Sequence, residues 1–340
     1  GMDAAAFPGA VITRISAIAV VLVGVLVAAC APEEIAFEVR EADTSLAGAY
    51  RSDAGRTGRA QGAVGDAPAV AYRIDGTDPV IASPVLVGDT GFVPDGSGDL
   101  VAFEAATGAV RWRARVGDAE ASVVASSDSV FSVSSAGVVR RHDSGSGTVE
   151  WQTDLDGFAR SSPILFDGEL WVAVGEELVG LDPNSGVRIE SVELGARADS
   201  SPAVAGGVIV IGTRANVLAF VDRTTMSVAT IPFPDPGEGV TTYAEGVAAT
   251  PAISDGSVFV GSTAGVLASA SVTGEIEWMV DIGSPIYGAV AVGDGAGFVP
   301  TGSGELFAFD LDTGDVLWSA DLGDAAYSSP VLVGEIVLAS

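Results

Sequence analysis

Short apolar segments separated by glycine- and aspartate-rich turns recur along the chain. Between residues 289 and 322, four of them follow one another: AVAVGD, AGFVP, ELFAFD and DVLWSADLG. Apolar runs of about four to eight residues, with turn residues every ~8–12, are typical of short antiparallel strands. The pattern therefore predicts a four-stranded antiparallel unit and favours an all-β fold.

This unit repeats. Its turn residues align at Gly108, Gly147, Gly186, Thr225, Gly274 and Gly314, in steps of 39, 39, 39, 49 and 40 residues. A tryptophan lies four residues after four of these positions: Trp112, Trp151, Trp278 and Trp318. Small-residue corners precede the first apolar run of each unit, at Ser83-Pro84, Ser122-Val123, Ser162-Pro163, Ser201-Pro202, Thr250-Pro251, Gly288-Ala289 and Ser329-Pro330. A repeat of about 40 residues is typical of propellers and related arrays.

Seven corners predict a β-propeller of about seven four-stranded blades, because radial repetition buries the faces that one blade alone leaves exposed. The segment VAYRIDG around Tyr72 resembles the tryptophan-bearing outer strand VLWSADLG. We therefore expect the two ends of the chain to share the closing blade. The third strand of that blade should begin where the sequence stops, at Ser340, so we expect a truncated carboxy terminus and eight blades in that case.

One stretch carries a family resemblance. AFDLDTGDVLW matches the A-x-D-x-x-T-G-x-x-x-W motif of PQQ-like propeller repeats at every defined position: Ala308, Asp310, Thr313, Gly314 and Trp318. AFEAATGAVRW, at residues 102–112, matches it with Glu104 in place of the aspartate, and AGAYRSDAGRTG from Ala47 resembles the lead-in to the first blade. Over about residues 48–340 the chain resembles the quinoprotein alcohol dehydrogenase-like repeat family, including its BamB-like lipoproteins. The resemblance is specific for fold and weak for function.

The motif has a physical interpretation of its own. Asp310 is expected to accept hydrogen bonds from the following turn, and Gly314 to provide its positive φ. Trp318 is expected to pack on the next blade, with about 2–3 kcal/mol gained if it is fully buried. Glu190 and Ala229 occupy the tryptophan position in the third and fourth repeats, which predicts weaker junctions there.

The amino terminus indicates export. Arg14 precedes an apolar run that ends at Cys30, the only cysteine. The run is short for a membrane span and suits a signal peptide, and its VAAC ending resembles a bacterial lipobox. We predict a signal peptide at 1–29, a lipidated amino terminus and flexible tether at 30–69, and the propeller at 70–340. An ordinary export signal, or a short anchor in which Cys30 is incidental, is the alternative.

The net charge of the chain and its lack of lysine exclude several classes of function. The formal net charge is -29 and no lysine occurs, which excludes a Walker A loop, a Schiff-base lysine and a Ser/Lys dyad. The acidity disfavours binding to nucleic acid or to an anionic bilayer. We expect a solvated acidic surface, with attraction of a cationic ligand or basic partner as the alternative.

Candidate catalytic and metal-binding residues are few. His142, the single histidine, stands where other repeats have Phe103 and Phe309, so we expect a packing or surface role rather than catalysis. Two segments faintly resemble calcium loops, DGSGD with Asp95, Ser97 and Asp99, and DLDTGD with Asp310, Asp312 and Asp315. Both coincide with hairpin turns, so we predict no metal site.

The resemblance also raises an enzyme hypothesis. PQQ-dependent dehydrogenases share these repeats but are much longer, and many have an adjacent-cysteine disulfide, a catalytic aspartate and calcium ligands in the channel. With its single cysteine, the chain is predicted to bind no cofactor and to be no enzyme. We predict a monomeric, non-catalytic scaffold that contacts envelope proteins and is held by lipid at the periplasmic face of an outer membrane, or at the outer face of a plasma membrane. A cell-surface propeller that binds a small ligand or PQQ-type cofactor, with redox activity, is the alternative.

One segment departs from the repeat. Residues 231–248, IPFPDPGEGVTTYAEGVA, add about ten residues between the fourth and fifth repeats and contain Phe233 and Tyr243. In a propeller this connection lies beside the channel mouth, so we predict a partner-binding loop. A variable surface loop without function is the alternative.

Overall fold

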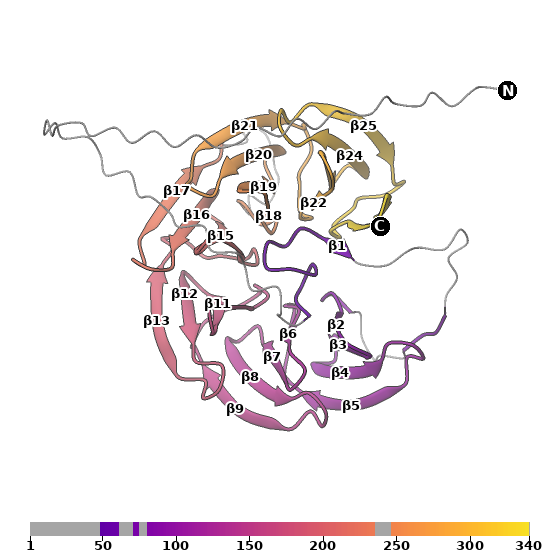
Figure 1. Cartoon of the computed structure of the whole chain (residues 1–340), viewed down its shortest axis with the longest axis vertical. Coiled ribbons are helices and arrows are strands. Elements are labelled where there is room, and N and C mark those ends of the chain that lie inside the picture. Colours follow the sequence, from indigo (N-terminus) through magenta and orange to yellow (C-terminus); the bar gives the residue numbers. More distant parts are fainter. Residues whose placement is uncertain (1–47, 61–70, 75–79, 235–245, 340) are drawn as a thin grey trace, which may run out of the picture. The chain divides into compact units, whose positions relative to one another are not determined.

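Six four-stranded antiparallel sheets and one three-stranded sheet stand around a common centre as the blades of a propeller (Figure 1). The computed structural model describes residues 48–60, 71–74, 80–234 and 246–339, all within the compact unit Phe37–Ser340. These residues contain strands and no helix. The predicted all-β propeller of about seven blades is therefore confirmed.

The blades are numbered in chain order, and within each the strands run outward from the centre. They are blade 1 (β2–β5), blade 2 (β6–β9), blade 3 (β10–β13), blade 4 (β14–β17), blade 5 (β18–β21), blade 6 (β22–β25) and blade 7 (β1, β26 and β27). The innermost strands of blades 1–6 are β2 (Val85–Val87), β6 (Val124–Ala125), β10 (Ile164–Phe166), β14 (Ala203–Ala205), β18 (Ala252–Ser254) and β22 (Ala291–Val292). The second strands are β3 (Thr90–Pro94), β7 (Ser129–Val133), β11 (Glu169–Val174), β15 (Val208–Thr213), β19 (Ser257–Gly261) and β23 (Ala296–Pro300).

The third strands are β4 (Asp99–Glu104), β8 (Val138–Asp143), β12 (Glu177–Leu181), β16 (Val217–Asp222), β20 (Val266–Ser271) and β24 (Glu305–Asp310). The outer strands are β5 (Val110–Arg115), β9 (Val149–Asp154), β13 (Arg188–Glu193), β17 (Val228–Pro232), β21 (Ile276–Asp281) and β25 (Val316–Asp321). Blade 7 contains β1 (Arg59–Ala60), β26 (Val331–Val333) and β27 (Ile336–Leu338). The second and third strands are mostly buried, and the outer strands are largely exposed.

The turn between the third and outer strands follows the aspartate of the repeat. In blade 6, Asp310 Oδ1 accepts hydrogen bonds from the backbone N–H groups of Asp312 and Thr313, both at 3.0 Å. Gly314 has a φ of 75°, and a Cβ there would lie 2.6 Å from the Trp278 ring. The turn thus needs glycine both for its backbone conformation and for the approach of the neighbouring blade.

In blade 4 the left-handed turn residue is Met226, with a φ of 55°, and not Thr225 as the sequence alignment had it. Met226 N–H donates to the carbonyl of Asp222, as Gly314 does to that of Asp310. The ladder that follows has no register shift, so Ala229 lies opposite Phe220, as Trp318 lies opposite Ala308. The alignment was wrong by one residue because it could not anticipate a non-glycine in this conformation.

Three repeat tryptophans dock onto the turn of the next blade. Their indole Nε1 atoms donate to carbonyl oxygens one residue after the turn aspartate: Trp112 to Ser144 at 2.9 Å, Trp151 to Pro183 at 3.0 Å and Trp278 to Leu311 at 2.8 Å. Trp318 differs, with 46% of its surface exposed, since the described part of blade 7 has no turn in front of it. The expected burial of Trp318 was therefore wrong.

Two other junctions use different side chains. Glu190 forms an ion pair with Arg223 of blade 4 at 2.7 Å, and this guanidinium also lies over the Trp171 ring. At the start of the first blade, Tyr72 donates its hydroxyl to the carbonyl of Ala105 at 2.7 Å, and its ring lies beside Gly108. Tyr72 thus takes the place of a repeat tryptophan, although residues 71–74 are not a strand.

A belt of hydroxyl groups joins the inner strands at one end of the channel. Five corner side chains each accept a hydrogen bond from the backbone N–H of the corner before, at 2.9–3.2 Å. The donor and acceptor pairs are Ser83 to Ser122, Ser122 to Ser162, Ser162 to Ser201, Ser201 to Thr250 and Ala289 to Ser329. Ala289, which the belt places at the equivalent position of blade 6, has no hydroxyl to offer Thr250. The corner there lies one residue later than the predicted Gly288.

Residues 48–60 occupy the centre of the ring and form a hub, drawn in indigo in Figure 1. Five inner strands donate backbone N–H groups to hub carbonyls: Ala125 to Gly48, Val204 to Ala54, Ile253 to Gly55, Val292 to Thr57 and Leu332 to Gly58, at 2.7–3.0 Å. The hub ends in β1, which pairs in parallel with β26. The sequence assigned these residues to a flexible tether. Their backbone carbonyls instead bind the inner strands, so the ordered chain begins well before residue 70.

Two arginines of the hub are buried. Arg56 is 0% exposed and donates to the carbonyls of Pro163 and Pro202, both at 3.0 Å, and of Tyr50 at 2.6 Å. Arg51 donates to the carbonyls of Arg56, Val290 and Pro330. Burial lowers the pKa of Arg56 to about 10, which leaves it charged at neutral pH. Carbonyl dipoles from several blades therefore surround a buried positive charge.

The predicted signal peptide and Cys30 lie outside the described residues. Among the residues that the structure describes, no helix has the length and apolar character needed to cross a membrane.

Replacing Arg56 with alanine should strongly destabilise the propeller, because three carbonyls lose a charged donor in a site that excludes water. We expect a loss of about 3 kcal/mol or more in the free energy of unfolding, measured by denaturant titration. Arg56→Lys, which keeps the charge with a less suitable geometry, should lie between that variant and the wild type. Arg115→Ala is the control, since its side chain is 69% exposed and should matter by less than about 1 kcal/mol. Equal effects of Arg56→Ala and Arg115→Ala would contradict this role of the hub.

Candidate functional site

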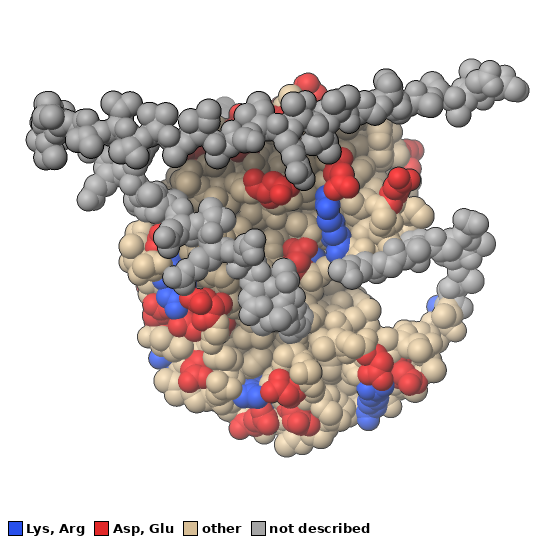
Figure 2. Space-filling model, viewed as in Figure 1, with Lys and Arg blue, Asp and Glu red and all other residues tan. Residues whose placement is uncertain are grey.

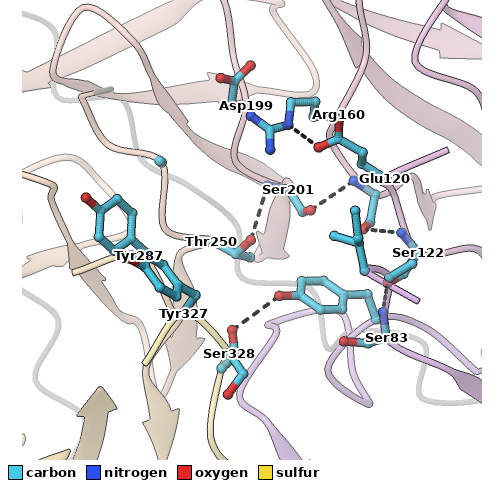
Figure 3. Close-up of a pocket in the computed structure, with 16 residues that line it drawn as sticks. Ser83, Glu120, Ser122, Arg160, Asp199, Ser201, Thr250, Tyr287, Tyr327 and Ser328 are labelled. Carbon is cyan, nitrogen blue, oxygen red and sulfur yellow. Dashed lines mark hydrogen bonds and ion pairs between the residues drawn. The ribbon is translucent and has the colours of Figure 1, made fainter. Parts of the chain in front are cut away.

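One residue from each blade lines the mouth of the channel, two positions before the corner. In blade order these mouth residues are Ile81, Glu120, Arg160, Asp199, Ala248, Tyr287 and Tyr327. They surround a cavity of about 630 Å³, with the hydroxyl belt and Tyr50 of the hub also in its wall (Figure 3). A cavity of this size is typical of ligand-binding sites.

The mouth residues of blades 2–4 form an ionic arc. Arg160 Nε lies 2.7 Å from Glu120 Oε2. Asp199 binds Arg197 at 2.8 Å and Arg214 at 2.5 Å. Burial raises the pKa of Asp199, but the hydrogen bonds and charges of the two arginines outweigh it and the net shift is downward. Asp199 is therefore ionised at neutral pH and holds the two arginines in place.

The mouth residues of blades 6, 7 and 1 form an apolar arc. The rings of Tyr287 and Tyr327 lie 5.2 Å apart between centroids. Tyr327 is 65% exposed and Ile81 is 70% exposed. Exposed apolar side chains on a rigid frame are typical of surfaces that bind a partner. The mouth therefore has a charged arc and an apolar arc, joined on one side by the small Ala248.

The predicted partner-binding loop is corrected in part. Phe233 is 7% exposed and packs in the core of blades 4 and 5 with Val247 and Ile253. Its ring is therefore a core group and is not available to a partner, because the connection first covers the blade interface. Tyr243 lies outside the described residues. Of the described residues of the long connection, Ala248 reaches the cavity wall.

His142 is buried in blade 2. Its Nδ1 lies 3.3 Å from the carbonyl of Gly147 and its Nε2 lies 3.0 Å from Ser132 Oγ. A carbonyl accepts only, so Nδ1 carries the proton and Nε2 accepts from the serine. Burial lowers the pKa of His142 more than the carbonyl of Gly147 raises it, and the charge of Arg140 lowers it further. The histidine is thus a neutral packing group, remote from the mouth residues.

The two calcium-like segments serve their own turns. Asp95 Oδ1 accepts hydrogen bonds from the N–H groups of Ser97 and Asp99, at 3.0 and 3.1 Å. Its other oxygen pairs with Arg113 at 3.1 Å. In the part of the chain that the structure describes, no group of three or more carboxylate, histidine or cysteine side chains could hold a metal ion.

The mouth residues were not singled out from the sequence. Their signal was available, since each stands two positions before an aligned corner. The position shows no common chemistry, however, with isoleucine, glutamate, arginine, aspartate, alanine and tyrosine all present. A motif search finds positions that agree, whereas recognition sites on a repeat scaffold are found where equivalent positions differ.

The fold and the mouth define a class, a β-propeller with a ligand-sized cavity where the channel opens. The family model described as "Outer membrane protein assembly factor BamB" matches residues 51–232 and 227–340. The chain therefore belongs to that family. No curated protein has a matching sequence.

Several solved structures share the fold. BamB from Moraxella catarrhalis is 19% identical with a TM-score of 0.66, and the match covers 79% of this chain and 82% of that one. A europium-containing methanol dehydrogenase is 12% identical with a TM-score of 0.53, covering 84% and 87%. Quinohemoprotein alcohol dehydrogenase from Comamonas testosteroni is 13% identical with a TM-score of 0.54, covering 85% and 75%. At these identities the likeness shows the fold alone.

The residues present do not fit a quinone with its calcium ion. The hub fills the centre of the ring, and the ionised groups of the mouth are engaged with one another. The described carboxylates form no metal-binding group, and the sequence has one cysteine.

Protonation of His142 should destabilise the fold in mild acid. The pKa of His142 in the folded state lies below its unfolded value of about 6.5. The stability that the neutral ring contributes is therefore present above that pH and is lost as the pH falls below it. His142→Gln keeps hydrogen-bonding atoms but does not titrate in this range. Free energies of unfolding measured from about pH 8 to pH 5 should show the wild type losing stability relative to the variant. If the free energies of unfolding of the wild type and of His142→Gln change in parallel with pH, protonation of His142 does not affect stability.

Proposed function

We propose that this BamB-family propeller is a non-catalytic envelope scaffold that holds other envelope proteins at its mouth, tethered by a lipid on Cys30. The observation that carries the proposal is the variable mouth position, where one frame presents six residue types at seven equivalent positions. A rigid frame loses little conformational freedom on binding, so exposed side chains on it contribute efficiently to affinity. Membership of the family described as an outer membrane assembly factor supports an envelope role.

The catalytic alternative has less support from the site. Acid-base or nucleophilic chemistry needs a histidine, a thiol or a coupled pair of carboxylates. The described mouth residues include none of these groups. Glu120 forms an ion pair with Arg160, and Asp199 forms one with Arg197. A quinone-binding propeller, the second candidate, has only the fold that the chain shares with two dehydrogenases in its support. A stoichiometric quinone spectrum, or dye reduction that depends on added PQQ and calcium, would favour it.

A photo-crosslinking amino acid placed in the mouth should capture envelope proteins in living cells. We expect discrete adducts from position 248, where Ala248 faces the cavity between the two arcs, and from Tyr327. The matched control is Leu317 on the outer strand β25, which is 54% exposed and distant from the cavity. Adducts of equal yield from Leu317 and the mouth positions, or none from the mouth, would count against a scaffold with a mouth-directed partner.

The tether is tested separately. Cys30→Ser should move the protein from the membrane fraction to the soluble fraction, because a lipid-bearing cysteine supplies the acyl chains that stable anchoring requires. Mass spectrometry of the mature amino terminus should show acyl groups on the wild type alone. Retention of Cys30→Ser in the membrane fraction, with no acyl mass on the wild type, would show that Cys30 is incidental.

A further inference from the structure

We infer that the mouth cavity binds a polypeptide segment that presents an aromatic or large apolar side chain next to a carboxylate. The inference rests on the proposed scaffold function and names the chemistry of the partner. In it, the aromatic group packs on the Tyr287–Tyr327–Ile81 arc, and the carboxylate pairs with guanidinium groups of the ionic arc, chiefly that of Arg160.

Of the charged side chains that line the cavity, that of Arg160 is the most exposed. Arg160, Arg197 and Arg214 are 38%, 34% and 33% exposed, whereas Glu120 is 29% exposed and Asp199 only 7%. The carboxylate that fixes two of the arginines is thus hidden beneath them. A group that enters the cavity can reach the guanidinium of Arg160, and guanidinium binds carboxylates with paired, directional hydrogen bonds.

Arg160 is the cation nearest the centre of this arc. It uses Nε in its pair with Glu120, and Figure 3 shows its guanidinium in the cavity wall between Glu120 and Asp199. Glu120 fixes the direction of the side chain without covering it, since Arg160 stays more than a third exposed. A positioned arginine with an accessible guanidinium is suited to a ligand carboxylate.

The apolar arc lies across the cavity from Arg160 and sets the other half of the ligand. Tyr287 and Tyr327 present tilted rings, and the adjoining Ile81 and Val80 are 70% and 52% exposed. Covering this surface favours an aromatic or large aliphatic side chain. The backbone N–H groups of Ser83, Ser122, Ser162 and Ser201 bind belt hydroxyls, so recognition at this level is by side chains.

The rest of the molecule makes this site selective. The chain has 45 acidic residues against 16 arginines, and carboxylates outnumber guanidinium groups over the face seen in Figure 2. An acidic segment is repelled elsewhere and finds the accessible guanidinium of Arg160 at the mouth. Such a contrast in charge fixes where and in which orientation a partner docks.

Binding of short labelled peptides to the full chain tests the inference. The probe is fluorescein-Gly-Asp-Phe-Asp-Phe-Gly, followed by fluorescence anisotropy. One matched peptide has lysine in place of each aspartate, and another has serine in place of each phenylalanine. We expect saturable binding of the acidic aromatic peptide, at least tenfold weaker binding of both controls, and weakening of the first as salt is raised.

Three variants locate the contact. Arg160→Gln and Tyr327→Ala should each weaken the acidic aromatic peptide about tenfold, the effect of one charge-assisted hydrogen bond or one buried aromatic contact. Arg115→Gln, an exposed arginine on an outer strand, should leave the affinity unchanged. Thermal unfolding of each variant checks that the propeller is intact.

Several results would overturn the inference. They are equal or tighter binding of the lysine peptide, no saturable binding up to about 1 mM, and equal affinity in Arg160→Gln and Arg115→Gln. If crosslinks from the mouth are still obtained in any of these cases, the scaffold function stands and only the acidic aromatic chemistry is wrong. Loss of both the crosslinks and peptide binding would remove the proposed function as well.

Discussion

The guanidinium groups of Arg51 and Arg56 bind carbonyl oxygens at the centre of the ring, and the rest of the propeller is arranged around them. Their acceptors just before the inner strands each stand one residue after a corner: Pro163, Pro202, Val290 and Pro330. Two residues further on, N–H groups of the inner strands donate to the hub backbone. A blade is an incomplete folding unit whose faces need neighbours. The hub links blades that are far apart in the sequence and so fixes the diameter of the channel.

The hub also explains the character of the site. With residues 48–60 in the centre, the channel is closed beneath the belt and becomes a cavity at one end, with Tyr50 in its wall. The polar backbone groups at this level are satisfied by the belt and the hub, so the side chains two positions before each corner are left to vary. In each connection between blades, the corner therefore contributes to stability, and the residue two positions before it is available for recognition. A change of mouth residue alters the ligand chemistry without removing a hydrogen bond of the frame.

The junctions between blades show how one requirement is met by different residues. Trp112, Trp151 and Trp278 supply a ring and an N–H donor, and Tyr72 supplies a ring and an O–H donor. Glu190 uses an ion pair with Arg223. The sequence pattern alone predicted a weak junction at Glu190, because a charged residue at a packing position has no visible partner until the chain folds. The cation sits one residue past the turn aspartate of the next blade, where the other junctions offer a carbonyl.

The sequence by itself determined the propeller, its approximate blade number and its family, because turns, corners and tryptophans recur at intervals set by local geometry. It left a packing or a surface role open for His142, which the repeat aligns with Phe103 and Phe309, and the structure shows that the residue is buried. Only the tertiary structure decided that residues 48–60 are a hub, that Phe233 is core and that the mouth residues form two arcs. Those properties depend on contacts between different blades, and for the hub between segments more than a hundred residues apart, such as Arg56 with Pro163 and Pro202. Local periodicity carries no information about such contacts, and the free energy that fixes them arises only when the ring has closed.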